Sequence, residues 1–470
     1  MRLTKIVITL GPSTDSEEMI EKLAEKGVNI IRFNFSHDTH ERHLEKINRV
    51  REVGNRLGKN FALLLDTKGP EIRLGTFAND FEVYEKGEIV KICKKEMLGT
   101  HEMFHIQCPE LFDDISVNDF ILIDDGKQKV TVLENDGEVL TCRVEVAGPI
   151  KTRKGCNVPN VKLTMPFISE KDLSDVEFAC DNDLDYIAAS FVRHKQDVLD
   201  IRSILKRKGK ENIQIIAKIE NQEGFDNLED ILQVADGIMV ARGDLGVEVE
   251  TQFVPIYQKK IIKLANKYGK PVITATHMLD SMTTNPRPTR AEAGDVCNAV
   301  LDGTDCVMLS GESAAGDYPI EAINTMSVIC EAAEKMIPYN ERLEKYKKYN
   351  QNTIQDAIGI SISDATIALD IACIVVFTQS GSTAKKISKF RPNVPILAVT
   401  FSKHIQRSLE SFWGVKSVYS EAKNQMINDD DLASKIAKEH GYKPGQLIII
   451  SAGYPTGVGS ANMMKIVEIK

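Results

Sequence analysis

The segment IQIIAKIENQEGFDNLEDILQVADGIMVA, residues 213–241, places a helical segment between two short runs rich in Ile and Val. Such runs recur along the first 330 residues, each followed by a polar end and then by a helical pattern. They lie at residues 5–10, 28–35, 61–66, 186–191, 213–219, 237–241, 271–276 and 306–310. Eight strand–helix units predict a closed parallel (β/α)8 barrel, the TIM-barrel architecture.

A doubly wound open sheet is the main structural alternative. The count of eight units and the absence of a G-x-G-x-x-G sequence after the first strand argue against it. The helices have the expected period: in residues 255–268 the apolar positions 261, 264, 265 and 268 lie on one face, and Gly269 supplies a stop.

The spacing between strands is about 25 to 35 residues except once, between Asp66 and Asp185, where it exceeds a hundred. Within that insertion, residues 81–92, 119–133 and 137–146 form β-rich stretches around Asp-Gly turns, which predicts a small β-barrel lid over the barrel mouth. Further strands are expected at 373–377, 396–400, 415–419, 447–451 and 465–469. The predicted domains are therefore a barrel (1–69 and 167–345), a lid (70–166) and a C-terminal α/β regulatory domain (346–470), with residues 340–352 as the linker candidate.

Composition is that of a compact soluble protein, with 42% hydrophobic and 27% charged residues. The 59 basic and 68 acidic residues leave a net charge of -9, which gives no general attraction for nucleic acid or an anionic membrane. We expect no membrane span, and the N-terminal apolar run is too short for a signal peptide. Nine cysteines without a C-x-x-C pair predict reduced core residues in a cytoplasmic protein.

Polar residues cluster where the predicted strands end. In a parallel barrel these ends surround one site, and side chains two apart on a strand point the same way. The residues concerned are Arg32, Asn34 and Ser36, then Asp66, then Lys218 and Glu220, then Arg242 and Asp244, then Thr274 and Thr276, and finally Ser310 and Glu312. Any single one is more simply read as a cap or a solvated group, but six strand ends together predict a site.

Two of these carboxylates, Glu220 and Asp244, form a hard-oxygen pair suited to magnesium or manganese, with water and substrate oxygens completing the shell. Lys218 and Arg32 add positive charge beside it. This arrangement suits a transferring phosphoryl group, because that chemistry depends on positioning and charge neutralisation. The alternative for Lys218 and Glu220 is a plain ion pair.

Eight blocks in order complete a resemblance: ITLGPST, IIRFNFSH, LLLDTKGPEIR, IIAKIENQEG, GIMVARGDLGVE, VITATHMLDSM, NPRPTRAEAGDV and LSGESAAGDYP. Together they resemble the pyruvate kinase family over essentially all 470 residues. The resemblance implies magnesium- and potassium-dependent phosphoryl transfer from phosphoenolpyruvate to ADP, giving pyruvate and ATP in the last step of glycolysis. It also implies a homotetramer.

The resemblance also implies residue roles. Glu220 and Asp244 would hold magnesium, Lys218 and Arg32 would bind and neutralise the phosphoryl group, and Thr276 would lie beside the enolate carbon. The substrate-contacting set would be Arg32, Ser190, Lys218, Ala241, Arg242, Gly243, Asp244 and Thr276. Potassium would bind Asn34, Ser36, Asp66 and the Thr67 carbonyl, and the nucleotide phosphates would lie near Asn34, His37 and Arg73.

Two single residues and two loops lie at positions that vary within the family. Glu71 lies where potassium-dependent relatives carry Glu and potassium-independent ones carry Lys; the alternative is a solvated hinge residue. His277 replaces the commoner Gln and is expected to pack; the alternative is that it alters the proton route. Residues Thr378, Gln379, Ser380, Gly381, Ser382 and Thr383 resemble the family's effector-phosphate loop, because glycine and hydroxyls precede a helix; the alternative is a simple helix cap. The later loop at 453–462 lacks the basic residues of fructose-bisphosphate-activated relatives, so a sugar monophosphate or a nucleotide is an equally good effector.

Two other classes of protein remain open on the residues alone. A lysine Schiff-base aldolase also carries a lysine at a barrel strand end, but it has no need for Glu220 and Asp244. A non-catalytic sensor of phosphorylated metabolites would use only the last domain, and intact polar groups at six strand ends argue against it.

Overall fold

The computed structural model describes residues 1–421, 430–453 and 462–470, and its centre is the predicted closed parallel barrel. Around the barrel the order is β1, β2, β3, β13, β14, β15, β16 and β17, and β17 pairs with β1 to close it. The strands are β1 (Lys5–Thr9), β2 (Ile30–Asn34), β3 (Ala62–Asp66), β13 (Tyr186–Ala189), β14 (Gln214–Ile219), β15 (Gly237–Ala241), β16 (Val272–Ala275) and β17 (Cys306–Leu309). Closure excludes the open-sheet alternative.

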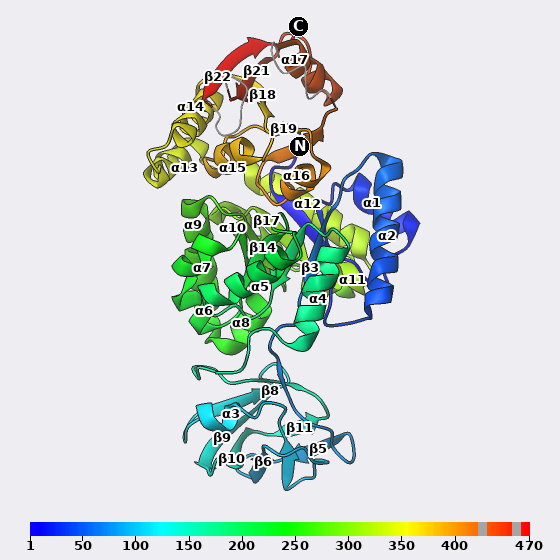
Figure 1. Ribbon diagram of the computed structural model, residues 1–470, viewed down its shortest axis with the longest axis vertical. Helices are drawn as coiled ribbons and strands as arrows, with labels where there is room; N and C mark the ends of the chain where they lie inside the picture. Colours follow the sequence, from blue (N-terminus) through cyan, green and yellow to red (C-terminus); the bar gives the residue numbers. More distant parts are fainter. Residues whose placement is uncertain (422–429, 454–461) are drawn as a thin grey trace.

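Helices surround the barrel as an outer ring (Figure 1). They are α1 (Glu17–Glu25), α2 (His40–Leu57), α4 (Glu170–Asp181), α5 (Lys195–Arg207), α6 (Gln222–Asp226), α7 (Leu228–Val234), α8 (Arg242–Glu248), α9 (Val254–Tyr268), α10 (Arg290–Asp302), α11 (Gly311–Ala314) and α12 (Pro319–Lys335). Helix α9 ends at Gly269 in the left-handed conformation (φ 65°), as the sequence predicts.

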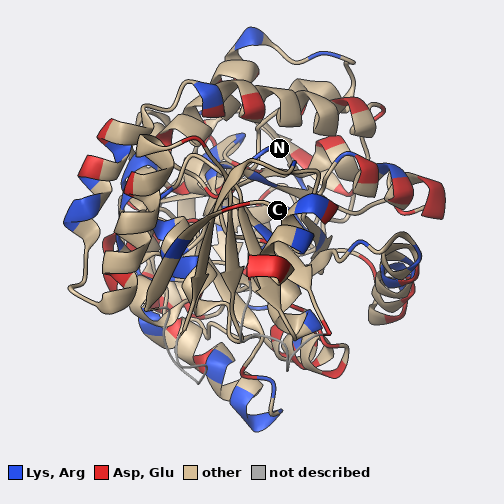
Figure 2. Cartoon of the chain, turned by 90° about the horizontal axis from the view of Figure 1, so that it is seen from above, with Lys and Arg blue, Asp and Glu red and all other residues tan. Residues whose placement is uncertain are grey.

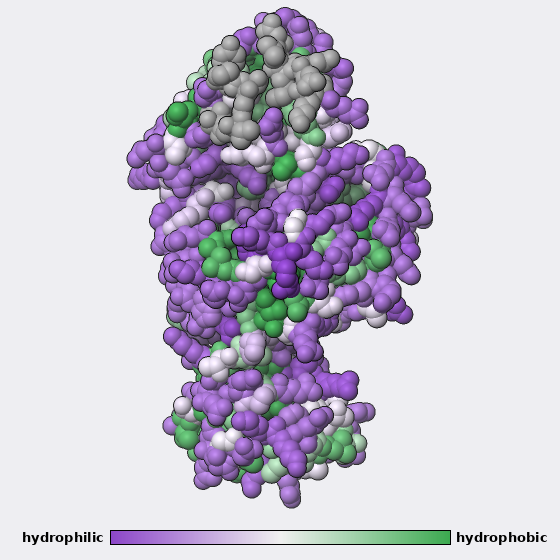
Figure 3. All heavy atoms as spheres, viewed as in Figure 1, coloured by the Kyte–Doolittle hydropathy of each residue, from purple (hydrophilic) through white to green (hydrophobic). Residues whose placement is uncertain are grey.

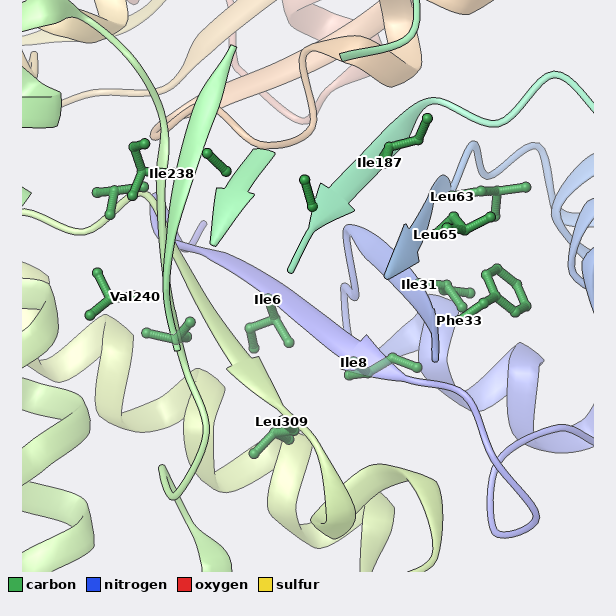
Figure 4. Packing of buried hydrophobic residues seen from close by; sticks show 14 of the residues in the cluster. Ile6, Ile8, Ile31, Phe33, Leu63, Leu65, Ile187, Ile238, Val240 and Leu309 are labelled. Carbon is green, nitrogen blue, oxygen red and sulfur yellow. The ribbon is translucent and has the colours of Figure 1, made fainter. Parts of the chain in front are cut away.

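Alternation along the strands separates two apolar layers. Outward side chains, among them Ile31 and Phe33 of β2 and Leu63 and Leu65 of β3, pack in the layer beneath the helices (Figure 4). The other parity fills the barrel interior with Val7, Ile30, Ala62, Leu64, Tyr186, Ala188, Ile216, Met239, Ile273, Ala275, Cys306 and Met308. Continuing that parity toward the carboxyl ends therefore points the next side chains into the barrel mouth.

The insertion between β3 and β13 is a mainly β unit with its own core, built of two sheets rather than a closed barrel. One sheet has the order β4-β12-β8-β9-β10-β6-β7, and β5 pairs with β11. The elements are β4 (Ile72–Arg73), β5 (Phe81–Tyr84), β6 (Ile89–Cys93), β7 (Met103–His105), α3 (Leu111–Asp114), β8 (Phe120–Ile123), β9 (Gln128–Asn135), β10 (Val139–Val146), β11 (Gly148–Lys151) and β12 (Gly155–Asn157). The molecule narrows between this lid and the barrel (Figure 3).

The C-terminal part contains the five predicted strands in the order β20-β19-β18-β21-β22. Its elements are α14 (Ile354–Ala368), β18 (Ile371–Phe377), α15 (Ser382–Lys389), β19 (Ile396–Thr400), α16 (Lys403–Ser408), β20 (Val415–Tyr419), α17 (Asp430–Glu439), β21 (Leu447–Ala452) and β22 (Met463–Glu468). Apolar clusters cover both faces of its sheet. Hydrogen bonds from Tyr186 and Gln214 to the Ser408 carbonyl join this part to the barrel end opposite the mouth.

Residues 340–352, the linker candidate, are mostly helical. Helix α13 (Tyr339–Tyr346) and a 3-10 turn, Lys347–Tyr349, occupy most of this segment. Leu343 and Tyr346, three apart on one helical face, are buried against Phe390 of the C-terminal part. The charged residues of the segment obscured this apolar pair.

The charged residues and the cysteines of the described part of the chain are distributed as follows. Basic residues (blue) and acidic residues (red) are interspersed along the outer helices in Figure 2. No helix within the described ranges is long and apolar enough to cross a membrane. All nine cysteines lie in the described part of the chain and are free, and only Cys297 is not fully buried.

Candidate active site

Charged and hydroxyl side chains replace apolar ones where the inward rows of the barrel reach its mouth. Val7 is followed by Thr9, Leu64 by Asp66, and Ile216 by Lys218 and then Glu220. In β2 the row continues from Ile30 to Arg32 and Asn34, and in β13 from Ala188 to Ser190. The strand parity used in the sequence argument therefore brings these residues together.

Asp66 is the centre of a buried hydrogen-bond network. It is 1% exposed; its Oδ2 accepts from Arg32 Nε at 2.6 Å and its Oδ1 accepts from Lys218 Nζ at 3.0 Å. Lys218 Nζ also donates to Ser190 Oγ at 2.7 Å, and that hydroxyl donates to the Thr67 carbonyl at 2.6 Å. Burial acts to raise the pKa of Asp66, but Lys218 and Arg32 outweigh it and hold the pKa below its usual value.

Lys218 is held as a cation between two carboxylates. Its Nζ lies 2.9 Å from Glu220 Oε1 in addition to its contact with Asp66. Burial acts to lower the Lys218 pKa, yet Asp66, Glu220 and the nearby Asp244 together raise it. Lys218 and Glu220 do form the ion pair given above as the alternative. Lys218 also pairs with Asp66, however, and all three groups lie at the barrel mouth.

Glu220 and Asp244 fit a divalent cation. Glu220 is fully buried; its Oε2 accepts from the Phe191 N–H at 2.6 Å, whereas Oε1 has no hydrogen bond in the described structure and only the Lys218 charge beside it. Burial raises the pKa of Glu220 to about 8, Lys218 opposes this, and Asp244 adds to it. Among the described residues no cluster of three or more potential metal ligands is present. The two carboxylates would therefore need substrate and water oxygens to complete a shell.

Oxygen donors suited to a large monovalent cation lie on β2 and β3. Asn34 and Asp66 are directly paired in the parallel register, and both belong to inward rows, so their side chains are neighbours. Asn34 Oδ1 accepts from the Ser36 N–H at 3.2 Å, and Ser36 itself is exposed. One carboxylate with an amide, a hydroxyl and the Thr67 carbonyl is a weak-field donor set with a single formal charge.

Thr276 lies directly after β16 in a conformation unusual for a side-chain-bearing residue, with φ 64°. Its Oγ1 accepts from the Gly243 N–H at 2.7 Å and donates to the Ala275 carbonyl. Arg242 holds this turn, because its guanidinium donates to the Thr276 carbonyl at 2.6 Å and pairs with Asp295. The Arg242 side chain is therefore turned away from the mouth, and the Gly243 N–H is already engaged.

Two residues expected at the mouth have structural roles instead. Thr274 has the outward parity of β16, is fully buried, and donates to Thr304 Oγ1 at 2.9 Å. Glu312 accepts from the N–H groups of Leu279 and Ser310, so it braces the turns after β16 and β17. Ser310 keeps the inward parity, and its hydroxyl has no partner among the described residues.

Of the residues expected near nucleotide phosphates, Asn34 neighbours Asp66, whereas His37 and Arg73 are separate from this network. His37 is exposed on the loop between β2 and α2. Arg73, at the base of the lid, donates two hydrogen bonds to the Glu71 carboxylate, at 2.9 and 2.6 Å, and Lys68 lies 3.4 Å from the same group. Glu71 is thus an ion-pair partner rather than a solvated hinge residue.

Two residues that support the site were missed from the sequence. Thr9 Oγ1 accepts from Arg32 Nη1 at 2.8 Å, and the inward parity of β1 was the signal that could have identified it. His43 of α2 stacks on Phe35 and bonds the His37 carbonyl through Nε2 at 2.8 Å, which fixes the loop after β2. No local pattern singles out this histidine.

Two cavities open beside the mouth. One of about 350 Å³ runs between lid and barrel, where Asn157 of β12 donates to Glu248 of α8 at 2.7 Å. The other, of about 760 Å³, is lined by Asp244, Thr276 and His277. His277 is exposed, so the expectation that it packs is wrong; its φ of 52° places it on the turn rather than in the core.

The candidate effector loop precedes α15. Thr378 Oγ1 accepts from the Gly381 N–H at 3.0 Å, and Gly381 takes a left-handed conformation at the start of the helix. The N-cap residue of α15 is Gly381, which has no side chain, but the Ser382 N–H of the first turn donates to Ser380 Oγ at 3.4 Å. The simple-cap alternative therefore accounts for the loop and for one of the first-turn N–H groups. Most of the later loop at 453–462 lies outside the described residues.

Comparison with known proteins agrees with this geometry. The family model "Pyruvate kinase, barrel domain" matches residues 1–323, and "Pyruvate kinase, alpha/beta domain" matches residues 356–467. The pyruvate kinase of Staphylococcus haemolyticus (strain JCSC1435) is 50% identical over 473 aligned residues, which cover 99% of this chain and 80% of that protein. The pyruvate kinases of Staphylococcus epidermidis (strain ATCC 12228 / FDA PCI 1200) and Staphylococcus aureus (strain MRSA252) are each 48% identical with the same coverage. The chain therefore belongs to the pyruvate kinase family.

Proposed function

We propose that this chain transfers the phosphoryl group of phosphoenolpyruvate to ADP, giving pyruvate and ATP, with magnesium and potassium as cofactors. The observation that carries the proposal is the position of Lys218 between Asp66 and Glu220, with Asp244 beside them. A fixed cation next to a carboxylate pair suits a phosphoryl group in transfer, because its negative charge must be neutralised as it moves.

The residues at the mouth have different roles in the proposed reaction. Arg32 and Lys218 bind the phosphoryl oxygens, and Ser190 and Asp66 hold Lys218 in place. Glu220 and Asp244 would hold magnesium, which supplies charge stabilisation to the enolate and the phosphoryl group when bound. In this proposal the Thr276 hydroxyl lies beside the enolate carbon, where a proton must be delivered. The backbone from Ala241 to Asp244 seats the substrate carboxylate.

The remaining assignments are proposals of the same kind. Potassium binds Asn34, Ser36, Asp66 and the Thr67 carbonyl, and the ADP phosphates contact His37, Asn34 and Arg73 once Arg73 leaves Glu71. A phosphorylated metabolite binds Thr378, Gln379, Ser380, Gly381, Ser382 and Thr383. The enzyme is a cytoplasmic homotetramer with domains 1–69 plus 167–345, 70–166 and 346–470, a division that the separate apolar cores support.

A borohydride test separates this function from the lysine Schiff-base alternative. Phosphoryl transfer requires the metal carboxylates, so a chelator should abolish turnover, and borohydride with substrate should leave Lys218 unmodified. Covalent trapping at Lys218 that persists in chelator would reject the proposal.

Replacing Asp244 by alanine is expected to weaken magnesium binding rather than the chemistry alone. The variant removes one of only two carboxylates at the site, and we expect the magnesium requirement to rise about tenfold or more, with added manganese recovering part of the rate. Activity titrated against each metal checks this. The matched control is Asp295→Ala, which removes a carboxylate that pairs with Arg242 behind the mouth. An unchanged magnesium requirement in Asp244→Ala would remove this residue from the metal site.

Magnesium binding is expected to release a proton near pH 7. Burial raises the pKa of Glu220 to about 8, so the metal-free carboxyl is largely protonated at pH 7 and must ionise to bind the cation. Apparent affinity should therefore increase with pH up to about 8 and then level off. Calorimetry in two buffers of different ionisation enthalpy measures the released protons. Release of no proton at pH 7 would contradict the assignment of Glu220.

For the effector loop, we expect Ser382→Asp to abolish activation by a phosphorylated metabolite. A fixed carboxylate in the first turn of α15 repels phosphate, whereas Ser382→Asn has a similar size without the charge and should retain activation. The measured quantity is the ratio of activity with and without effector. Equal ratios in the wild type and Ser382→Asp would leave the loop as a helix cap only.

A further inference from the structure

A cavity of about 150 Å³ lies at the other end of the barrel, where the C-terminal part meets helix α2. Arg51 and Asn55 of α2, Lys59 and Asn60 beyond its end, and Arg407 of α16 all line it. No acidic side chain lies among its lining residues in the described structure. This is unusual in a chain with a net charge of -9.

The cations around this cavity are held in place but incompletely neutralised. Arg407 Nε donates to the fully buried Asp185 at 2.7 Å, and one Arg51 nitrogen donates to the Asn182 carbonyl at 2.6 Å. Lys59 Nζ forms no ion pair or hydrogen bond within the ranges that the structure describes. Asp183 also lies near Arg51 and Arg407, but its carboxylate is already paired with Lys210. The three cations of the cavity therefore keep a surplus of positive charge.

The volume of this cavity limits the kind of ligand that it can hold. A drug-sized or nucleotide ligand needs a pocket of roughly 300 Å³ or more, whereas this one has about the volume of five waters at roughly 30 Å³ each. A tetrahedral oxyanion has five heavy atoms and carries close to two negative charges at pH 7. The amide groups of Asn55 and Asn60 provide additional donors.

We propose that this cavity binds a phosphate group, either as the free ion or as the head of a small monoester, and that the bound anion ties α16 to α2. The site is distinct from the barrel mouth and from the loop at 378–383. Because its cations come from both the barrel and the C-terminal part, occupancy favours the docked arrangement of the two.

Three variants with the same change in net charge test the proposal. Lys59→Gln removes a cation that has no partner to lose, and Asn55→Asp adds a carboxylate at the cavity. Arg56→Gln is the control, because Arg56 is adjacent on α2 but pairs with Glu17 and Glu21 outside the cavity. All are made in a Ser382→Asp background so that the effector loop does not contribute.

Calorimetric titration with inorganic phosphate and with glucose 6-phosphate, in magnesium-free chloride buffer, gives the affinities. We expect at least one probe to bind about tenfold or more weakly to Lys59→Gln and Asn55→Asp, and within twofold of the parent affinity to Arg56→Gln. Selective loss of inorganic phosphate binding identifies the free ion, and selective loss of glucose 6-phosphate binding identifies a monoester. Equal affinities in the parent, Lys59→Gln and Asn55→Asp, or binding of neither probe, would overturn the proposal.

Discussion

Replacing Lys218 by methionine is expected to lower kcat by about a thousandfold or more, a cost of ~4 kcal/mol in the transition state. The ammonium of Lys218 is the cation that neutralises the phosphoryl group in transfer, and methionine keeps the length of the side chain without the charge. An interaction made mainly in the transition state reduces kcat and kcat/KM together. Steady-state kinetics with phosphoenolpyruvate and ADP measures both.

The fold of this variant should survive because its buried carboxylates keep other partners. Asp66 retains Arg32, and Glu220 takes up a proton at neutral pH, since burial raises its pKa. Lys210→Met is the matched control, because Lys210 is paired with Asp183 on the surface. Circular dichroism and magnesium titration verify folding. If Lys218→Met keeps half of the wild-type turnover, Lys218 is not part of the mechanism.

Removal of potassium is expected to lower wild-type turnover by about a hundredfold, with sodium a poor replacement. A unit charge about 6 Å from the phosphoryl group is worth ~3 kcal/mol at an effective dielectric of 20. The donor set of Asn34, Ser36, Asp66 and the Thr67 carbonyl has a weak field suited to a large monovalent ion. Initial rates in tetramethylammonium, sodium and potassium buffers give the comparison.

Glu71→Lys should retain activity with much reduced potassium dependence, because its ammonium supplies the charge that the ion provides. The substitution also frees Arg73 from its two hydrogen bonds to Glu71. Glu71→Gln frees Arg73 without adding a cation, so the difference between the two variants isolates the charge. Full wild-type turnover in potassium-free tetramethylammonium buffer would contradict the potassium site whatever the variants do.

The barrel and its central residues were predictable because barrel strands are buried on both faces and therefore have recognisable apolar sequences. Ile- and Val-rich runs define the strands, and alternate positions then place Arg32, Asp66 and Lys218 in inward rows. The direct pairing of Asn34 with Asp66 depends on the register between β2 and β3, which only the structure shows. The alternation of side chains along the strands was therefore enough to predict which residues lie at the site.

Prediction failed where the chain leaves a strand. Thr274 and Thr276 share a parity, but that parity faces outward, and only the left-handed turn after Ala275 brings Thr276 to Gly243. Arg242 belongs to the first turn of α8, so alternation no longer applies to its side chain. The Glu71–Arg73 pair depends on the irregular base of the lid, for which the sequence has no periodic signal.

The central claim is that the barrel mouth transfers a phosphoryl group with the help of a metal held by Glu220 and Asp244. The most direct test incubates the protein with phosphoenolpyruvate, ADP, magnesium and potassium and measures pyruvate and ATP together. We expect equal amounts of both products, with formation abolished by chelator and reduced about a thousandfold in Lys218→Met. Pyruvate formed without ATP, or turnover that is indifferent to the chelator, would contradict the claim.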